Sequence, residues 1–256
     1  MTFNNTLHQQ QNNDFQGLVD LLENSLFKDV SIKSREFEKV RPCHDRLFLL
    51  KYLIDLKSEF YFEESKDFFT ASISSLIECL FQISLGRYRT THILLRSSLE
   101  AVCSGIYIEQ FASNPGEKFS NNLEKSIKRL VDVHAQGISK RQRKKFKSSV
   151  NLFVDHDIKK SLYWSLSDYV HSTKREYLSS EEYFEDMIQV NKKIDSDEFE
   201  KTISIFSDLL NSLIVLILIS DYDFYFGEPR DSVRIAVSRL SVSQKNLLDE
   251  WHTLVK

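Results

Sequence analysis

The chain has 256 residues, of which 41% are hydrophobic and 28% charged, so it holds enough apolar side chains for a core and is not a disordered protein. Its formal net charge of -3 excludes a general attraction to nucleic acids or anionic membranes, so any such binding must come from a local patch. The 6 glycines and 3 prolines are together under 4% of the chain, against roughly 12% in average proteins, and this scarcity of turn residues predicts an all-α protein.

The residues from Met1 to Asn13 are polar and rich in Gln and Asn, so we expect a flexible N-terminal segment there. One helical domain follows over residues 14–256, a bundle of about seven to nine helices. Connections are expected over Lys28 to Pro42 and Thr173 to Asp197. The helices are predicted at Asp14 to Phe27, Cys43 to Phe62, Glu63 to Leu85, Arg87 to Phe111, Glu117 to Gln136, Ser139 to Phe153, Leu162 to Ser172, Glu198 to Phe224 and Ser241 to Leu254.

Gly86 separates two long patterns of helical spacing, Glu63 to Leu85 and Arg87 to Phe111. Two amphipathic helices joined by so short a link predict a central antiparallel helix hairpin. We expect Arg87 to Phe111 and Glu198 to Phe224 to form the core of the bundle.

The most apolar run, Leu213 to Ile219, lies within Leu209 to Ile219 and raises the question of a membrane span. Its uninterrupted apolar part is far shorter than the ~20 residues that a span requires, and Asp208, Asn211 and Asp221 lie in or beside it. The sequence therefore predicts a buried core helix and no membrane contact.

Three cysteines, Cys43, Cys79 and Cys103, are an odd number and widely spaced. This pattern is typical of reduced structural thiols in a cytosolic protein. The first residues lack the basic start and apolar centre of a secretory signal, so we expect a cytoplasmic protein.

The helix Arg87 to Phe111 carries His92, Arg96 and Glu100 at i, i+4 and i+8, which places the three side chains along one stripe. Arg96 and Glu100 would form an internal ion pair in a structural interpretation. In a functional one, Arg96 holds a phosphate in a cleft, Glu100 orients Arg96, and His92, titrating near neutrality, shuttles a proton. Both interpretations are open at this level.

A second candidate face lies in WSLSDYVHSTKR, where Trp164, Asp168, His171 and Arg175 recur at helical spacing. Asp168 and His171 could simply pair near the end of a helix, where the dipole favours a protonated His. Alternatively, His171 stands beside a loop as an active-site group.

The most basic segment of the chain is KRQRKKFK. It is either a solvated helix face or the local footprint of a polyanion such as RNA. Its cations are Lys140, Arg141, Arg143, Lys144, Lys145 and Lys147.

Asp155, His156 and Asp157 could suggest a metal site. No further His or carboxylate stands at ligand spacing on a neighbouring turn, so we predict that the aspartates cap the following helix and that no metal binds. Glycine-rich phosphate loops, dinucleotide fingerprints and nucleophile elbows are absent from the sequence, and no cofactor is expected.

Two segments, LGRYRTTHILLRSSLE at 85–100 and YWSLSDYVHST at 163–173, resemble uncharacterised bacterial helical proteins related to the HEPN superfamily. In that pattern a glycine-linked helix pair carries an Arg and a Glu, here Arg96 and Glu100, and a later helix ends in a His, here His171. The resemblance implies a HEPN-like core over about 63–226.

HEPN domains often dimerise. Many are metal-independent ribonucleases of toxin-antitoxin, abortive-infection and CRISPR-linked antiviral defence systems, and others are binding modules without catalytic activity. The resemblance implies that His171 takes the ribose 2'-hydroxyl proton and Arg96 stabilises the charge on phosphorus, supported by His92 and Glu100. Lys140 to Lys147 and Arg175 would bind the RNA, and the partner would be a second copy or a protein of the same system. The alternative is a non-enzymatic interaction or dimerisation module in which the His, Arg and Glu form a buried polar network.

Overall fold

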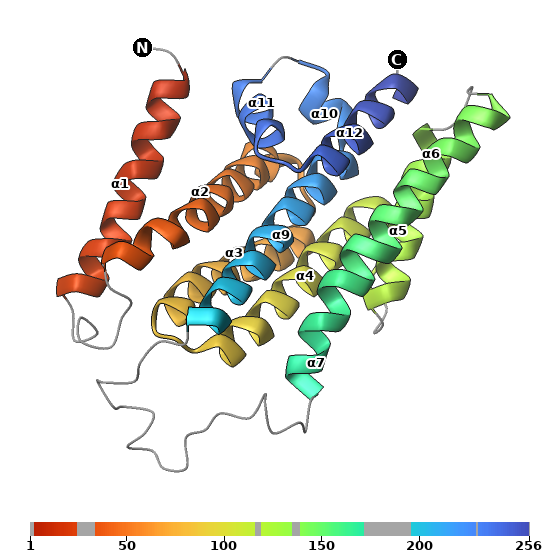
Figure 1. The fold of residues 1–256 in the computed structure, drawn as a ribbon. Helices are drawn as coiled ribbons and strands as arrows, with labels where there is room; N and C mark the ends of the chain where they lie inside the picture. Colours follow the sequence, from red (N-terminus) through yellow and green to blue (C-terminus); the bar gives the residue numbers. More distant parts are fainter. Residues whose placement is uncertain are drawn as a thin grey trace.

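A computed structural model describes residues 3–24, 34–115, 119–134, 139–171, 196–228 and 230–255. All regular structure in these residues is helical, so the prediction of an all-α helical bundle is confirmed (Figure 1). The elements are α1 (Phe3–Asn24), α2 (Ser34–Lys57), η1 (Ser58–Phe60), α3 (Glu63–Ser84), α4 (Tyr88–Phe111), α5 (Phe119–His134), α6 (Lys140–Leu152), η2 (Phe153–Trp164), α7 (Ser165–His171), α9 (Ser196–Ser220), α10 (Tyr222–Phe226), α11 (Asp231–Ser238) and α12 (Val242–Val255).

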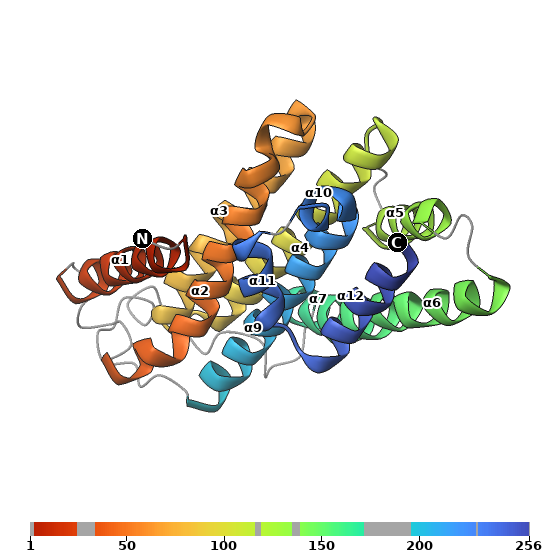
Figure 2. The same cartoon turned by 90° about the horizontal axis from the view of Figure 1, so that it is seen from above.

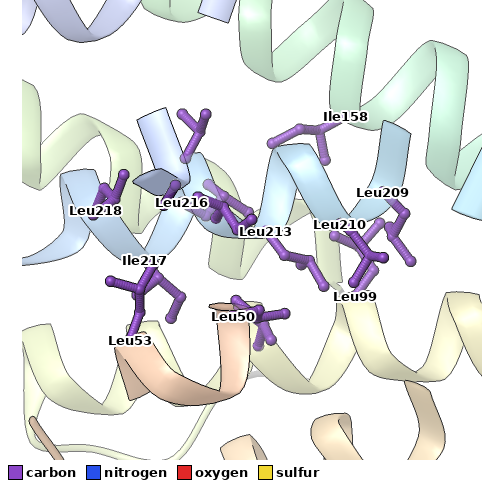
Figure 3. Packing of buried hydrophobic residues seen from close by; sticks show 14 of the residues in the cluster. Leu50, Leu53, Leu99, Ile158, Leu209, Leu210, Leu213, Leu216, Ile217 and Leu218 are labelled. Atoms are coloured by element: carbon purple, nitrogen blue, oxygen red, sulfur yellow. The ribbon is translucent and has the colours of Figure 1, made fainter. Parts of the chain in front are cut away.

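Helix α9 lies in the middle of the bundle, whereas α1 lies at its edge (Figures 1 and 2). Every residue from Leu209 to Ile219 is buried. Leu50 and Leu53 of α2, Leu99 of α4 and Ile158 of η2 approach α9 from different sides (Figure 3). An apolar run this long is stable in water only when neighbouring helices surround it, so burial explains the pattern.

Helix α9 is also long and apolar enough to cross a membrane, with a mean hydropathy of 2.1 in its best window. Inside the fold, 72% of that window is buried. Burial against α2, α4, η2 and α12 agrees with the prediction that this run is a core helix of the bundle.

Helices α3 and α4 pack antiparallel with a seven-residue repeat of close contacts. Three small residues of α3 donate hydrogen bonds to carbonyl oxygens of α4. Successive donors are seven residues apart along α3, and their acceptors are seven residues apart along α4 in the opposite direction. The pairs are Ser65 Oγ to Gly105 O (3.3 Å), Ser72 Oγ to Ser98 O (3.1 Å) and Cys79 Sγ to Thr91 O (3.5 Å). A repeat of seven matches the seam along which two α-helices stay in contact.

Two glycines allow this pairing. Gly86 has a φ of 69°, which an L side chain rarely adopts, and its N–H bonds the Ile83 carbonyl oxygen as α3 ends. A Cβ added to Gly105 would lie 2.7 Å from Cε1 of Phe69, so only glycine lets the two helices approach this closely.

The structure differs from the sequence prediction at the N-terminus. The residues Phe3 to Asn13, predicted to be flexible, belong to α1. Leu7, Gln11 and Phe15 form a buried stripe at helical spacing, and Gln11 Nε2 donates to the Asp45 carbonyl oxygen of α2 at 3.2 Å. The many Gln and Asn side chains conceal this stripe in the sequence.

The predicted connection Lys28 to Pro42 is partly helix. Residues 25–33 lie outside the described residues, but α2 begins at Ser34 and continues through Pro42. Pro42 is exposed, and the buried stripe of Val40, Cys43 and Leu47 runs past it. Packing on that stripe overrides the helix-breaking tendency of proline.

Two further boundaries differ. The helix predicted up to Phe224 ends at Ser220, because Asp221 leaves the helical conformation before α10 begins. In addition, α6, η2 and α7 follow one another without a break, and η2 has π-helical hydrogen bonding. The prediction that Asp155 and Asp157 cap a new helix is therefore wrong.

Candidate functional site

His92 is fully buried at the contact between α4 and α9. Its Nε2 lies 3.4 Å from Oγ1 of the buried Thr202. Burial, with a smaller contribution from Lys201, lowers the pKa of His92 from 6.5 to about 4. The imidazole is therefore neutral at neutral pH, and the expectation that His92 titrates near neutrality in a cleft is wrong.

Arg96 is held on two sides, and its side chain is only 17% exposed. Its Nε donates to Oε1 of Glu100 at 3.0 Å, so the predicted i, i+4 ion pair is present. Its Nη2 donates to the hydroxyl of Tyr163 in η2 at 3.0 Å, and the guanidinium carbon lies 4.9 Å from the centre of that ring. Arg96 thus joins α4 to the π-helical segment.

His92, Arg96 and Glu100 share one stripe of α4 but do not face the same neighbouring helix. A step of four residues turns a helix by about 400°, so the direction drifts by about 40° at each step. His92 faces α9, whereas Arg96 faces η2 and Glu100, 39% exposed, reaches solvent. The predicted set is therefore not one cluster.

The contact predicted between His171 and Arg96 involves a side chain outside the described residues. Helix α7 packs against α4 and ends at His171. The side chain of His171 and the whole of Arg175 lie outside the described residues, whereas Trp164 and Asp168 are exposed.

Tyr163 is the Arg96 partner that sequence reasoning did not single out. It lies 67 residues from Arg96 along the chain, within the segment 163–173. The sequence does show Tyr163 eight residues before the candidate His171. Helical spacing alone, however, does not predict contacts between residues of distant helices, so the contact with Arg96 was not foreseen.

The basic segment forms the first two turns of α6. Ser139 caps the helix, since its Oγ accepts the N–H of Gln142 and the Gln142 side chain accepts the N–H of Ser139. On the inner face the ring of Phe146 packs edge-on against Trp251 of α12, with centroids 4.8 Å apart. This contact fixes which face of α6 is turned to solvent.

The solvent face carries four exposed cations that make no ion pair with any described residue, and we call them the basic face: Lys140, Arg141, Lys144 and Lys147. The side chains of Arg143 and Lys145, predicted to bind RNA with them, lie outside the described residues. Lys140, Lys144 and Lys147 share one stripe because they stand at i, i+4 and i+7.

Within the described residues, no group of three or more His, Cys, Asp or Glu side chains is arranged to hold a metal ion. Asp155 pairs with Lys159, and His156 Nδ1 lies 3.1 Å from Asp157 Oδ1. The three cysteines are free and buried, and burial raises their pKa, which for Cys43 is about 12, so they are structural thiols.

Comparisons of the chain with protein-family models, with curated proteins and with solved structures gave no match.

Proposed function

We propose that the protein is a cytoplasmic, HEPN-like RNA-binding bundle of a bacterial defence or toxin-antitoxin system, which holds RNA on the basic face of α6. The observation that supports this proposal is the set of four exposed cations without a carboxylate partner among the described residues. Phosphate neutralisation by such cations supplies most of the non-specific affinity for nucleic acids.

The position of these cations adds to the argument. Lys140 and Arg141 stand in the first turn of α6, where the helix dipole disfavours positive charge, and like charges at i, i+4 repel each other. Helix stability therefore does not explain the basic face, whereas an anionic ligand does.

The test compares single-stranded RNA binding by the wild type and by a triple variant, Lys140→Ala, Arg141→Ala and Lys144→Ala. The matched control is Lys39→Ala, Lys51→Ala and Lys201→Ala, which removes three exposed cations that are already engaged in surface ion pairs. Fluorescence anisotropy should show that the triple variant loses affinity and that the slope of log K against log salt falls by about 2, at about 0.7 per phosphate contact. Equal affinities of the triple variant and the wild type would refute RNA binding at this face.

The proposal has a catalytic form, in which His171 and Arg96 cleave the RNA that the basic face holds. The growth and total RNA of cells expressing the wild type or His171→Ala test it. Toxicity that persists in His171→Ala would refute a catalytic His171 and leave RNA binding by α6 untouched.

A second candidate function is a non-enzymatic interaction module. The observation that favours it is that Arg96 is largely buried and already bonded to Glu100 and Tyr163, as in a structural polar network. An Arg that must receive a phosphate would first have to exchange these bonds. Intact RNA after long incubation with the purified protein, together with unchanged RNA in cells, would favour this second function.

A further inference from the structure

Two aromatic side chains are exposed at the turn between α2 and α3. Phe60 is 71% exposed and Phe62 is 48% exposed. The turn is fixed, since the N–H of Phe62 donates to Oε1 of Glu109 at 2.8 Å and the ring of Phe60 lies 5.9 Å from that of Phe224 in α10. Clustered aromatic rings held in water are typical of a binding surface.

An apolar pocket continues this surface. The guanidinium carbon of Arg230 lies 4.4 Å from the centre of the Phe224 ring, and Arg230 also lines a pocket of about 410 Å³. Tyr225, Val233 and Val237 form its apolar walls. The pocket offers room for an incoming apolar side chain beside the aromatic rings.

Carboxylates surround the rings and the pocket. Glu59, Asp223 and Glu228 are exposed and make no ion pair with any described residue. Two nearby cations pair with other carboxylates, Lys57 with Asp221 and Arg234 with Asp231, and the guanidinium of Arg230 lies over the Phe224 ring. We call this surface the acidic aromatic patch: Glu59, Phe60, Phe62, Asp223, Phe224 and Glu228.

The complement of this patch is the basic face on the same chain. Its cations make no ion pair with described residues. The start of α6 lies apart from α10 in both views of the fold (Figures 1 and 2). One copy therefore does not close this contact on itself.

We propose that the basic face of one copy docks on the acidic aromatic patch of a second copy. The two surfaces differ, so the contact is head-to-tail, and repeated contacts build an open chain or a ring. The carboxylates repel RNA from the patch, whereas they attract the first turn of α6 and offset its unfavourable position at the helix dipole. The inference goes beyond RNA binding and does not depend on it.

The test uses two variants that each lose one side of the contact. The patch variant is Glu59→Gln, Phe60→Ser and Asp223→Asn, and the face variant is Lys140→Gln, Arg141→Gln and Lys144→Gln. A matched control, Asp20→Asn, Leu21→Ser and Glu38→Gln, neutralises two exposed carboxylates and changes one exposed apolar residue of α1 and α2. Sedimentation velocity measures the mass of each protein as its concentration is raised, at about 0.05 M and about 0.5 M salt.

The wild type and the control should grow in mass with concentration, more strongly at low salt because the contact is between charges. Each variant alone should associate about tenfold or more weakly. An equal mixture should form dimers and stop there, because the patch variant keeps its basic face and the face variant keeps its patch. Dimers in the mixture also show that both variants are folded.

The proposal is overturned by a wild type that stays monomeric, by a patch variant that associates like the wild type, or by a mixture that does not associate. Failure of RNA binding looks different. The patch variant keeps the RNA-binding cations, so the two proposals are separated by loss of self-association together with an RNA affinity equal to that of the wild type at concentrations where the wild type is monomeric.

Discussion

At the scale of single residues, the burial of His92 has a consequence for stability against pH. Its pKa is about 4 in the folded chain, below the ordinary 6.5, because burial disfavours the charged imidazolium. Between these values the unfolded chain binds a proton that the folded chain does not, so stability falls as pH falls from 6.5 toward 4. One such group costs on the order of 3 kcal/mol across the whole window.

We therefore predict that His92→Gln flattens the dependence of stability on pH below 6.5. Glutamine can still hydrogen-bond Thr202 but takes up no proton. Urea unfolding of wild type and variant at several pH values between 7 and about 4.5 measures the difference in slope. The same change at the exposed His8 is the control, and parallel curves for His92→Gln and wild type would contradict the prediction.

Sequence reasoning found Arg96 and Glu100 as an ion pair because i, i+4 is a local relation on one helix. It did not find Tyr163 or Thr202, since both come from other helices and reach the stripe only through the fold. Local spacing predicts which side chains share a face, but the direction of that face depends on packing.

At the scale of helices, the α3–α4 seam limits what α3 accepts at every seventh residue. Ser72 is fully buried and donates to the Ser98 carbonyl oxygen. We predict that Ser72→Leu lowers the free energy of unfolding by about 1–3 kcal/mol, because the larger side chain forces the helices apart. Denaturant unfolding of this variant checks the effect.

The control for the seam is Ser74→Leu, two residues away on the exposed face of α3. There the change should stay within about 0.5 kcal/mol. Equal losses from the two changes would mean that close packing at the seam does not decide the result, because leucine is the better helix former at both positions.

The long helices were predictable because their apolar stripes are regular, as in α3, α4 and α9. The prediction was wrong where polar composition or charge suggested an end, over Met1 to Asn13 and at Asp155 to Asp157. In both places the buried residues, such as Leu7 and Ile158, continue the stripe. Continuity of the stripe was the stronger signal, and capping residues within it were misleading.

At the scale of the whole molecule, the fold presents a basic face and an acidic aromatic patch on different elements although the net charge is only -3. The basic face is contiguous in sequence and was predictable from it. The acidic aromatic patch was not, because it joins the turn after α2 to α10 and the residues that follow it. A fold is needed before such surfaces can be compared.

The two proposals share the basic face, so RNA and a second copy compete for the same cations. Because binding linkage is reciprocal, each should weaken the other by the same factor. We predict that single-stranded RNA lowers the mass of the self-associated wild type. At protein concentrations where the wild type is associated, the patch variant, which stays monomeric, should bind RNA more tightly than the wild type does.

Sedimentation with a labelled RNA measures both quantities in one experiment. The Asp20→Asn, Leu21→Ser and Glu38→Gln control should compete as the wild type does. If the labelled RNA instead sediments with the self-associated protein and binds it with unchanged affinity, the basic face is not covered in the assembly. That result would separate the RNA site from the docking site and require another surface for one of them.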